Sequence, residues 1–277
     1  MSRGSDFATR LRWWRRHRAW SQLDFAAHAE ISQRHLSFLE LGRAKPGREM
    51  VIRLAAALDV PLRQQNALLL AAGFAPIWRE TDLGAPELAR VRDALDYVMA
   101  QQEPFPAVAV DRHWNLLGSN KGAIRLVEFL VGPLAQDARI NLADALVAPD
   151  VLRPYLDNWA EVVRYFIRSV ETDAAADGTA ETAALLERLM GYEGVKSILK
   201  PGAINAAAGP VLSMHFRKGD VSLQLFTTIA TLGTPRDITL QELRIECFFP
   251  MDRPTAATFR SWAANGKTRR SRSATIR

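Results

Sequence analysis

Cysteine and long apolar runs are scarce in this chain of 277 residues. Cys247 is the single cysteine, which excludes an internal disulfide framework and a cysteine-rich zinc site. The longest near-continuous apolar run, Ala67–Trp78, is broken by Gly73 and Pro76 and is too short to span a bilayer. The basic residues near the N-terminus have no apolar stretch behind them, so we expect no secretory signal. These absences predict a cytoplasmic protein without a membrane partner.

Sequence motifs of catalysis are also absent. The chain has no G-x-S-x-G elbow, no H-E-x-x-H and no phosphate-binding G-x-x-x-x-G-K. The histidines, at positions 17, 28, 35, 113 and 215, do not combine metal-ligand spacing with a second donor on the same face. Cys247 falls in an apolar stretch that we expect to be a core strand. We therefore expect no catalytic residue, no metal site and no cofactor.

Charge is distributed unevenly along the chain. Residues 1–80 hold 13 Lys and Arg against 7 Asp and Glu, whereas residues 81–266 hold 18 against 23. The last eleven residues, 267–277, hold 5 against 0. A basic head, a mildly acidic body and a basic tail indicate a polyanionic partner for the head. Small domains also drift by a few charges, so this asymmetry needs a motif to give it meaning.

Residues 1–73 have the apolar spacing of short helices joined by tight turns. An apolar face repeats from Val51 to Leu58 at i, i+3, i+4 and i+7, which is typical of a helix. Pro61 is expected to open a further helix that ends at Gly73. With the helical patterns upstream, we predict an all-α domain of five helices over residues 1–73.

Residues 22–40 have the spacing of a helix-turn-helix, in which the second helix lies in the DNA major groove. Ser32 is the expected N-cap of the second helix, so that Gln33, Arg34 and His35 occupy its first turn. Gln pairs bidentately with adenine and Arg with guanine. Arg15 and Glu40 have the residue types and positions for an internal ion pair. The apolar residues expected to face inward are Phe25, Ala26, Ala29, Ile31, Leu36 and Leu39.

Several further side chains of the head are expected to contact DNA. Phe38, one turn after the first three polar residues, can meet a thymine methyl group. Gln22 begins the first helix, where an amide and exposed backbone N–H groups can hold a phosphate. Arg43 and Lys45 follow Gly42 in a loop that would pass the phosphate backbone. The complete set expected to contact double-stranded DNA is Gln22, Ser32, Gln33, Arg34, His35, Ser37, Phe38, Arg43 and Lys45.

After a linker and connecting helix at 74–103, the sequence contains both strand-like and helical apolar spacings. Strand-like alternation at 107–111 and 114–120 flanks a two-residue turn, and it returns at 211–218, 221–230 and 240–249. An apolar stripe predicts one helix over 152–170, and the Ala-, Thr- and Asp-rich residues 172–183 favour a mobile loop. We predict an α+β domain at 104–265, in which helices cover one face of a five-stranded antiparallel sheet, followed by a disordered basic tail at 266–277.

Two resemblances extend this interpretation. SQLDFAAHAEISQRHLSFLELGRAKP resembles the phage-repressor-like, xenobiotic-response-element (XRE) family of bacterial regulators, many of which carry Gly where this chain has Glu30. A positive φ at Glu30 would cost on the order of 1 kcal/mol without Gly. FPAVAVDRHWNLLGSN and TLGTPRDITLQELRIECFFPMD extend the likeness to the MmyB-like transcription regulators, which pair a repressor-type domain with a PAS-like ligand-binding domain. The resemblance implies a homodimer whose body binds a small molecule.

The body has more aromatic and aliphatic residues than one narrow helical seam requires. Ordinary core packing accounts for most of them, and Asn158 and His215 are equally compatible with structural roles or with orienting a ligand head group. The candidate ligand-binding residues are Trp114, Asn158, Trp159, Val163, Phe166, His215, Phe216 and Phe226. We expect a small apolar or acyl-like effector, of the fatty-acid kind. The alternatives are a ligand-independent DNA-binding protein whose body only dimerises and an enzyme fused to a DNA-binding head.

Overall fold

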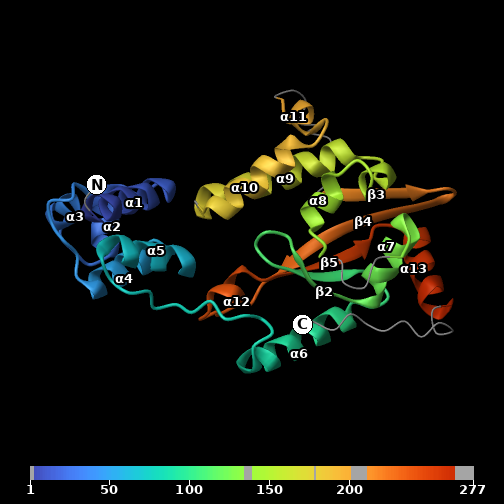
Figure 1. Cartoon of the computed structure of the whole chain (residues 1–277), viewed down its shortest axis with the longest axis horizontal. Coiled ribbons are helices and arrows are strands. Elements are labelled where there is room, and N and C mark those ends of the chain that lie inside the picture. Colours follow the sequence, from blue (N-terminus) through green and yellow to red (C-terminus); the bar gives the residue numbers. More distant parts are fainter. Residues whose placement is uncertain (1–2, 134–138, 178, 201–210, 266–277) are drawn as a thin grey trace. The chain divides into compact units, whose positions relative to one another are not determined.

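The computed structural model describes residues 3–133, 139–177, 179–200 and 211–265 (Figure 1). They fold into two compact units, which are considered separately. Unit 1 comprises Met1–Thr81 together with Gly233–Gln241, and unit 2 comprises Asp82–Leu232 and Glu242–Arg277. The chain therefore enters unit 1 twice. The basic tail expected at 266–277 lies outside the described residues.

Unit 1 is all-helical, as the apolar spacing predicts. Its core is built around Phe7, Leu11, Phe25, Leu36 and Leu54, each of them almost completely buried. Gly73, at φ 92°, caps the last of the five N-terminal helices in the left-handed conformation, which glycine adopts without a steric penalty. These helices are α1 (Arg3–His17), α2 (Gln22–His28), α3 (Gln33–Glu40), α4 (Arg48–Ala57) and α5 (Leu62–Ala72).

A short segment from late in the sequence completes unit 1. Residues 233–241 contain most of α12 (Ile238–Glu242), and Ile238 is buried. The Gln241 side chain accepts a hydrogen bond of 2.7 Å from the Leu62 backbone N–H, one of the donors that the first turn of α5 leaves unsatisfied. The Asp237 carboxylate accepts a bond of 2.7 Å from the Thr81 hydroxyl. Because α12 occupies 240–242, the strand predicted to begin at 240 begins only at Arg244.

Unit 2 contains the five-stranded antiparallel sheet, in the order β2-β1-β5-β4-β3. The amino- and carboxyl-terminal hairpins meet where β1 pairs with β5, so strands distant in sequence share one core. Gly219, at φ 56°, turns the chain between β3 and β4. The strands are β1 (Ala107–Val110), β2 (Leu116–Ser119), β3 (Ser213–Lys218), β4 (Val221–Ala230) and β5 (Arg244–Pro250).

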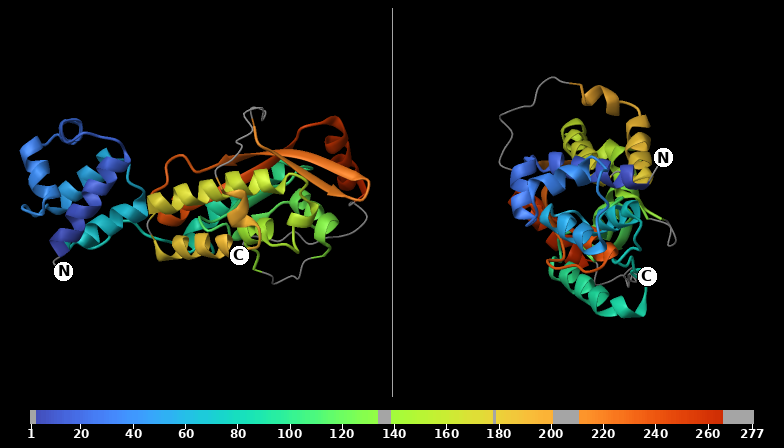
Figure 2. Two further views of the ribbon diagram at one scale, coloured as in Figure 1. Left: turned by 90° about the horizontal axis from the view of Figure 1, so that it is seen from above. Right: turned by 90° about the vertical axis from the view of Figure 1, so that its left-hand side faces the viewer.

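Helices cover the sheet more fully than the predicted single layer. α9 contacts β3 from one side, and α6 contacts β1 and β5 from the other (Figures 1 and 2). The second layer includes α13, a helix that the sequence analysis missed. The helices of unit 2 are η1 (Pro86–Leu88), α6 (Ala89–Gln101), α7 (Lys121–Val131), α8 (Leu142–Val147), η2 (Arg153–Tyr155), α9 (Trp159–Asp177), α10 (Ala180–Gly191), α11 (Val195–Ile198) and α13 (Arg253–Asn265).

Three local predictions for unit 2 were wrong. The helix expected from 152 begins at Trp159, because Leu156 instead forms an isolated bridge with Phe216 of β3. The loop expected at 172–183 is helical up to Asp177 and again from Ala180, in keeping with the high helix propensity of alanine. The two-residue turn expected at 112–113 is a longer connection between β1 and β2, in which Trp114 adopts a positive φ of 65°.

Candidate functional site

Helices α2 and α3 form a helix-turn-helix with a side-chain cap at each start. Ser21 Oγ accepts a hydrogen bond of 3.1 Å from the Asp24 N–H, and Ser32 Oγ accepts one of 3.1 Å from the His35 N–H. Between the helices, Glu30 adopts a φ of 54°, as expected for the position where related sequences carry glycine. The predicted cap at Ser32 is confirmed, and Glu30 adopts the positive φ that is costly for a residue other than glycine.

A buried ion pair fixes α3 to α1. Arg15 Nε and Nη2 donate to the two carboxylate oxygens of Glu40 at 2.6 and 2.9 Å, which confirms the predicted pair. The Gln22 amide also donates to Glu40, at 2.7 Å, and the Arg12 guanidinium donates to the Glu40 backbone carbonyl. A bidentate Arg–carboxylate contact restricts orientation as well as distance. The angle at which α3 leaves the core is therefore held by charge-assisted bonds.

The outward face of α3 carries the polar residues expected to read bases. Gln33 and Arg34 are exposed, whereas His35, Ser37 and Phe38 are half-buried. The Arg34 guanidinium lies 5.4 Å from the centre of the Phe38 ring, a cation–π distance that links two of these residues.

The residues expected at the phosphate backbone lie around the ends of α2 and α3. Gly42, at φ 70°, turns the chain after α3, and Arg43 and Lys45 follow it in exposed positions. The Phe38 carbonyl accepts the Arg43 backbone N–H at 2.8 Å, which fixes this loop against α3. Gln22 is half-buried at the start of α2, with its amide directed to Glu40.

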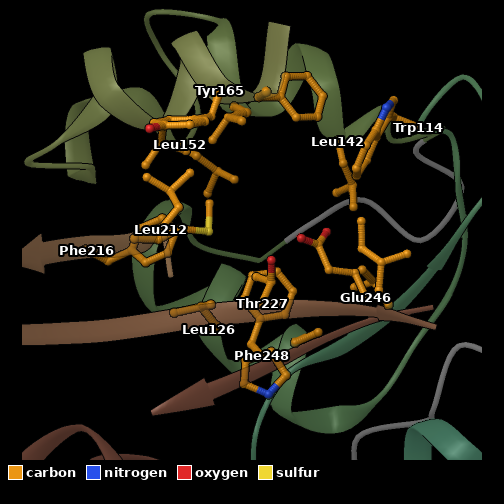
Figure 3. Close-up of a pocket in the computed structure, with 18 of the residues that line it drawn as sticks. Trp114, Leu126, Leu142, Leu152, Tyr165, Leu212, Phe216, Thr227, Glu246 and Phe248 are labelled. Atoms are coloured by element: carbon orange, nitrogen blue, oxygen red, sulfur yellow. The ribbon is translucent and has the colours of Figure 1, made fainter. Parts of the chain in front are cut away.

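Unit 2 contains a partly open cavity of about 410 Å³ between the sheet and helices α7, α8 and α9 (Figure 3). This volume falls within the range of small-molecule sites, which are mostly apolar with few placed polar groups. The lining residues are Pro106, Val108, Trp114, Ala123, Leu126, Val127, Leu130, Leu142, Leu146, Leu152, Val162, Tyr165, Phe166, Ser169, Val211, Leu212, Met214, Phe216, Thr227, Ile229, Glu246 and Phe248.

Three of the candidate ligand-binding residues line this cavity. Trp114 and Phe166 meet edge to face, with their ring centres 4.7 Å apart, and Phe216 lies on the sheet side. The Trp114 indole N–H is buried and donates to no acceptor in the part of the chain that the structure describes. The turn that carries Trp114 thus places a large aromatic ring and an unused donor at the cavity wall.

The remaining aromatic and aliphatic candidates lie elsewhere in unit 2. Val163 is completely buried in the core behind the cavity lining. Trp159 donates from its indole to the Leu146 carbonyl at 3.1 Å, and the Arg153 guanidinium lies 3.8 Å from its ring centre. Phe226 stacks on Phe249 at 5.3 Å. None of these three is a cavity-lining residue.

The two polar candidates bind the protein itself. Asn158 donates to the Ser213 carbonyl at 2.7 Å and accepts the His215 backbone N–H at 3.0 Å, so it ties the start of α9 to β3. The His215 ring nitrogen Nε2 lies 2.7 Å from the Ser213 hydroxyl. Both contacts are structural, and neither residue lines the cavity.

The most polar group in the cavity is the carboxyl of Glu246 in β5, which was not among the predicted site residues. Burial raises the pKa of its carboxyl from 4.5 to about 7, although a hydrogen bond from Thr227 and the positive charge of Arg244 both act to lower it. Figure 3 shows the carboxylate of Glu246 and the hydroxyl of Thr227 pointing into the space between sheet and helices. The available signal was the strand alternation, which places Arg244, Glu246 and Phe248 on one face.

Metal ligation and membrane spanning were the remaining possibilities for the described residues. Within them, no group of three or more His, Cys, Asp or Glu side chains could hold a metal ion. No helix of this part of the chain has the length and apolarity needed to cross a membrane.

Comparison with known families agrees with both units. Residues 91–261 match the model of the MmyB-like transcription regulator ligand binding domain, which is more than half of the chain. Residues 11–65 match a helix-turn-helix model. None of the curated proteins matches the chain.

Proposed function

The chain belongs to the family of the MmyB-like transcription regulator ligand binding domain, and from this premise we propose how its two units divide the regulatory task. Its helix-turn-helix and ligand-binding domains are those of a DNA-binding transcription regulator that takes a small-molecule effector. In this proposal α3 of unit 1 reads the operator, and the cavity of unit 2 holds an apolar or acyl-like effector. The exposed polar turn of a capped, ion-paired recognition helix supports the first part.

Base reading is assigned to the N-terminal turn of α3. Gln33 and Arg34 are exposed there, and their amide and guanidinium groups match the donor and acceptor pattern of adenine and guanine edges. Phe38, held against Arg34, provides an apolar surface for a thymine methyl group. His35 and Ser37 complete this face.

Positioning on the phosphate backbone is assigned to the flanking residues. Arg43 and Lys45 are exposed cations in the loop after α3, and such contacts fix register without carrying sequence information. Gln22 contributes through the N-terminal end of α2, because its own amide N–H is already bonded to Glu40.

The cavity is the observation that carries the effector part of the proposal. Its wall is largely aliphatic and aromatic, including Trp114, Phe166 and Phe216, which suits the alkyl or acyl chain of a ligand whatever its polar end. A homodimer, the usual state of helix-turn-helix regulators, would then present two recognition helices to two half-sites. Effector binding would favour one of two conformations of that dimer and so retain or lose the match to half-site spacing.

Two experiments test the proposal. Selection of bound DNA from a random pool, with and without cell extract, should recover a palindromic site whose enrichment changes with extract. A pool that shows no enrichment would contradict sequence-specific binding by α3. Native mass spectrometry of the full chain should show a dimer with a co-purifying small molecule. A dimer without ligand, and without a thermal shift in a panel of lipids and metabolites, would instead favour a body that serves dimerisation alone.

A further inference from the structure

Glu246 is an unusual wall residue for a cavity that would hold a plain hydrocarbon chain. It lies opposite Ile229 in the register of β4 and β5, with Thr227 as its diagonal neighbour on β4. All three residues line the cavity, and the Glu246 carboxylate points into it (Figure 3). A carboxylate in an apolar cavity is costly unless a partner group satisfies it. The Thr227 hydroxyl supplies one hydrogen bond and no charge.

A neighbouring cation, Arg244, forms its ion pair with another carboxylate and not with Glu246. Arg244, two residues earlier on β5, donates from Nη2 to the Asp173 carboxylate at 2.6 Å. Its guanidinium also lies 5.8 Å from the centre of the Trp114 ring. The positive charge of Arg244 is thus matched by Asp173, and no ion pair of Glu246 is present among the described residues. None of the described residues that line the cavity is Lys, Arg or His.

This arrangement selects among apolar ligands by their polar end. A fatty carboxylate beside Glu246 would bring a second negative charge into the same apolar space, where like charges repel strongly. A hydroxyl or amide N–H would satisfy the carboxylate with a hydrogen bond, and a protonated amine would add the missing charge. Hydrogen bonds to a charged partner contribute roughly 1.5–3 kcal/mol.

Building on the effector cavity proposed above, we propose that its ligand is an apolar molecule with a hydrogen-bond donor, above all a protonated amine, that binds the Glu246 carboxylate. The apolar part of the ligand occupies the aliphatic wall formed by residues such as Leu126, Leu152 and Val162. Its polar end lies at the sheet, between Glu246 and Thr227. Chain length and shape set affinity, whereas Glu246 sets the chemical class.

The test compares probes that share one chain and differ in the polar end. Dodecylamine, dodecanol and dodecanoate are titrated against the full-length protein at pH 8, each below its critical micelle concentration, by calorimetry and thermal shift. We expect the amine to bind more tightly than the carboxylate by about ten- to hundredfold, with the alcohol between them. In Glu246→Gln, the amine should lose most of this advantage and the carboxylate should gain.

Glu128→Gln is the matched control. It also removes one carboxylate, but Glu128 is exposed on α7 and does not line the cavity. This variant should bind the three probes as the wild type does. Because the wild-type comparison needs no substitution, the result does not depend on how well Glu246→Gln folds.

The outcomes separate this inference from the proposed function. If dodecanoate binds as tightly as the amine or more tightly, the cavity accepts an apolar effector and the role of Glu246 is refuted. An amine preference that survives in Glu246→Gln, or disappears in Glu128→Gln, overturns it as well. If none of the three probes binds, the effector cavity itself is in error and the inference falls with it.

Discussion

Glu40 of unit 1 and Glu246 of unit 2 are both surrounded by apolar residues, but their charges are matched to different degrees. Glu40 of unit 1 receives both arms of the Arg15 guanidinium and the Gln22 amide, so its charge is matched inside the protein. Glu246 of unit 2 receives the Thr227 hydroxyl, while its neighbour Arg244 pairs with Asp173. The ion pair of Glu40 holds α3, the helix proposed to read DNA, in a fixed orientation. The carboxylate of Glu246 has no ion pair among the described residues, so the cavity can respond to the polar group of a ligand.

Arg15→Ala should have the largest effect, because it would make Glu40 as unmatched as Glu246. Removing one partner of a buried pair typically costs about 3–5 kcal/mol. We expect unit 1 to unfold at lower temperature and denaturant concentration, with loss of DNA binding, while unit 2 retains its own transition. Calorimetry and denaturant titration of the full chain measure this difference.

The exposed pair between Arg10 and Asp6 provides the control for Arg15→Ala, with side chains 46% and 56% exposed. Arg10→Ala should cost below about 1 kcal/mol, as surface pairs usually do. Equal losses in the two variants would show that the buried pair does not anchor α3.

Glu246→Gln should come next, and its effect should depend on pH. The raised pKa means that the folded protein holds the proton more tightly than the unfolded chain does. Protonation of Glu246 therefore makes its full contribution to the free energy of unfolding below pH 4.5, and this contribution is lost as the pH rises through about 7. At pH 8, without ligand, the variant should gain up to about 3 kcal/mol, and at pH 4 it should gain little. The free energies of unfolding of the wild type and of Glu246→Gln are measured at both pH values. A difference between the two proteins that is the same at pH 4 and pH 8 would contradict this expectation.

Arg34→Ala should produce a smaller effect, on DNA selectivity rather than folding. Loss of a bidentate contact to guanine is expected to cost roughly 1–3 kcal/mol and to relax base preference at one position of the site. Binding to a set of single-base variants of the selected operator measures both quantities. Arg43→Ala serves as the comparison, because a phosphate contact should weaken binding uniformly and reduce its salt dependence. A uniform loss for Arg34→Ala would reassign that residue to the backbone.

Gln241→Ala should have the smallest effect of the four. It removes the acceptor of the Leu62 N–H at the start of α5, and losses of helix-capping bonds typically cost about 1 kcal/mol. The loss of stability should appear in the unfolding transition of unit 1, although residue 241 lies in the sequence between β4 and β5 of unit 2. Thr234→Ala, exposed in the same segment, is the control and should leave stability unchanged. If both variants behave alike, the segment contributes no stability to unit 1.

The sequence was most informative where structure depends on local contacts. The five helices of unit 1, the cap at Ser32 and the pair between Arg15 and Glu40 all follow from spacings within some forty residues. Three of the cavity residues, Trp114, Phe166 and Phe216, were also proposed from composition. In each of these cases the information lay in the residue type and in its place within a local pattern.

Predictions failed where distant segments decide the conformation. The bridge between Leu156 and Phe216 delays α9, and neither residue signals the other in the sequence. Val163 belongs to the same apolar stripe as Phe166, yet one is core and the other lines the cavity. Glu246 was missed because a single carboxylate in a strand resembles a solvent-facing residue until the covering helices are placed.

The segment 233–241 also bears on how this protein can be divided. A fragment that ends at Thr81 would retain all five N-terminal helices but would lack Ile238, Asp237 and Gln241, which complete unit 1. A single cut after Thr81 would leave segment 233–241 of unit 1 attached to unit 2, since the backbone passes between the units after Thr81, after Leu232 and after Gln241. The DNA-reading part is therefore not a transferable module in the linear sense. A fusion that joins residues 1–81 to another protein would transfer the five N-terminal helices without segment 233–241, which completes unit 1.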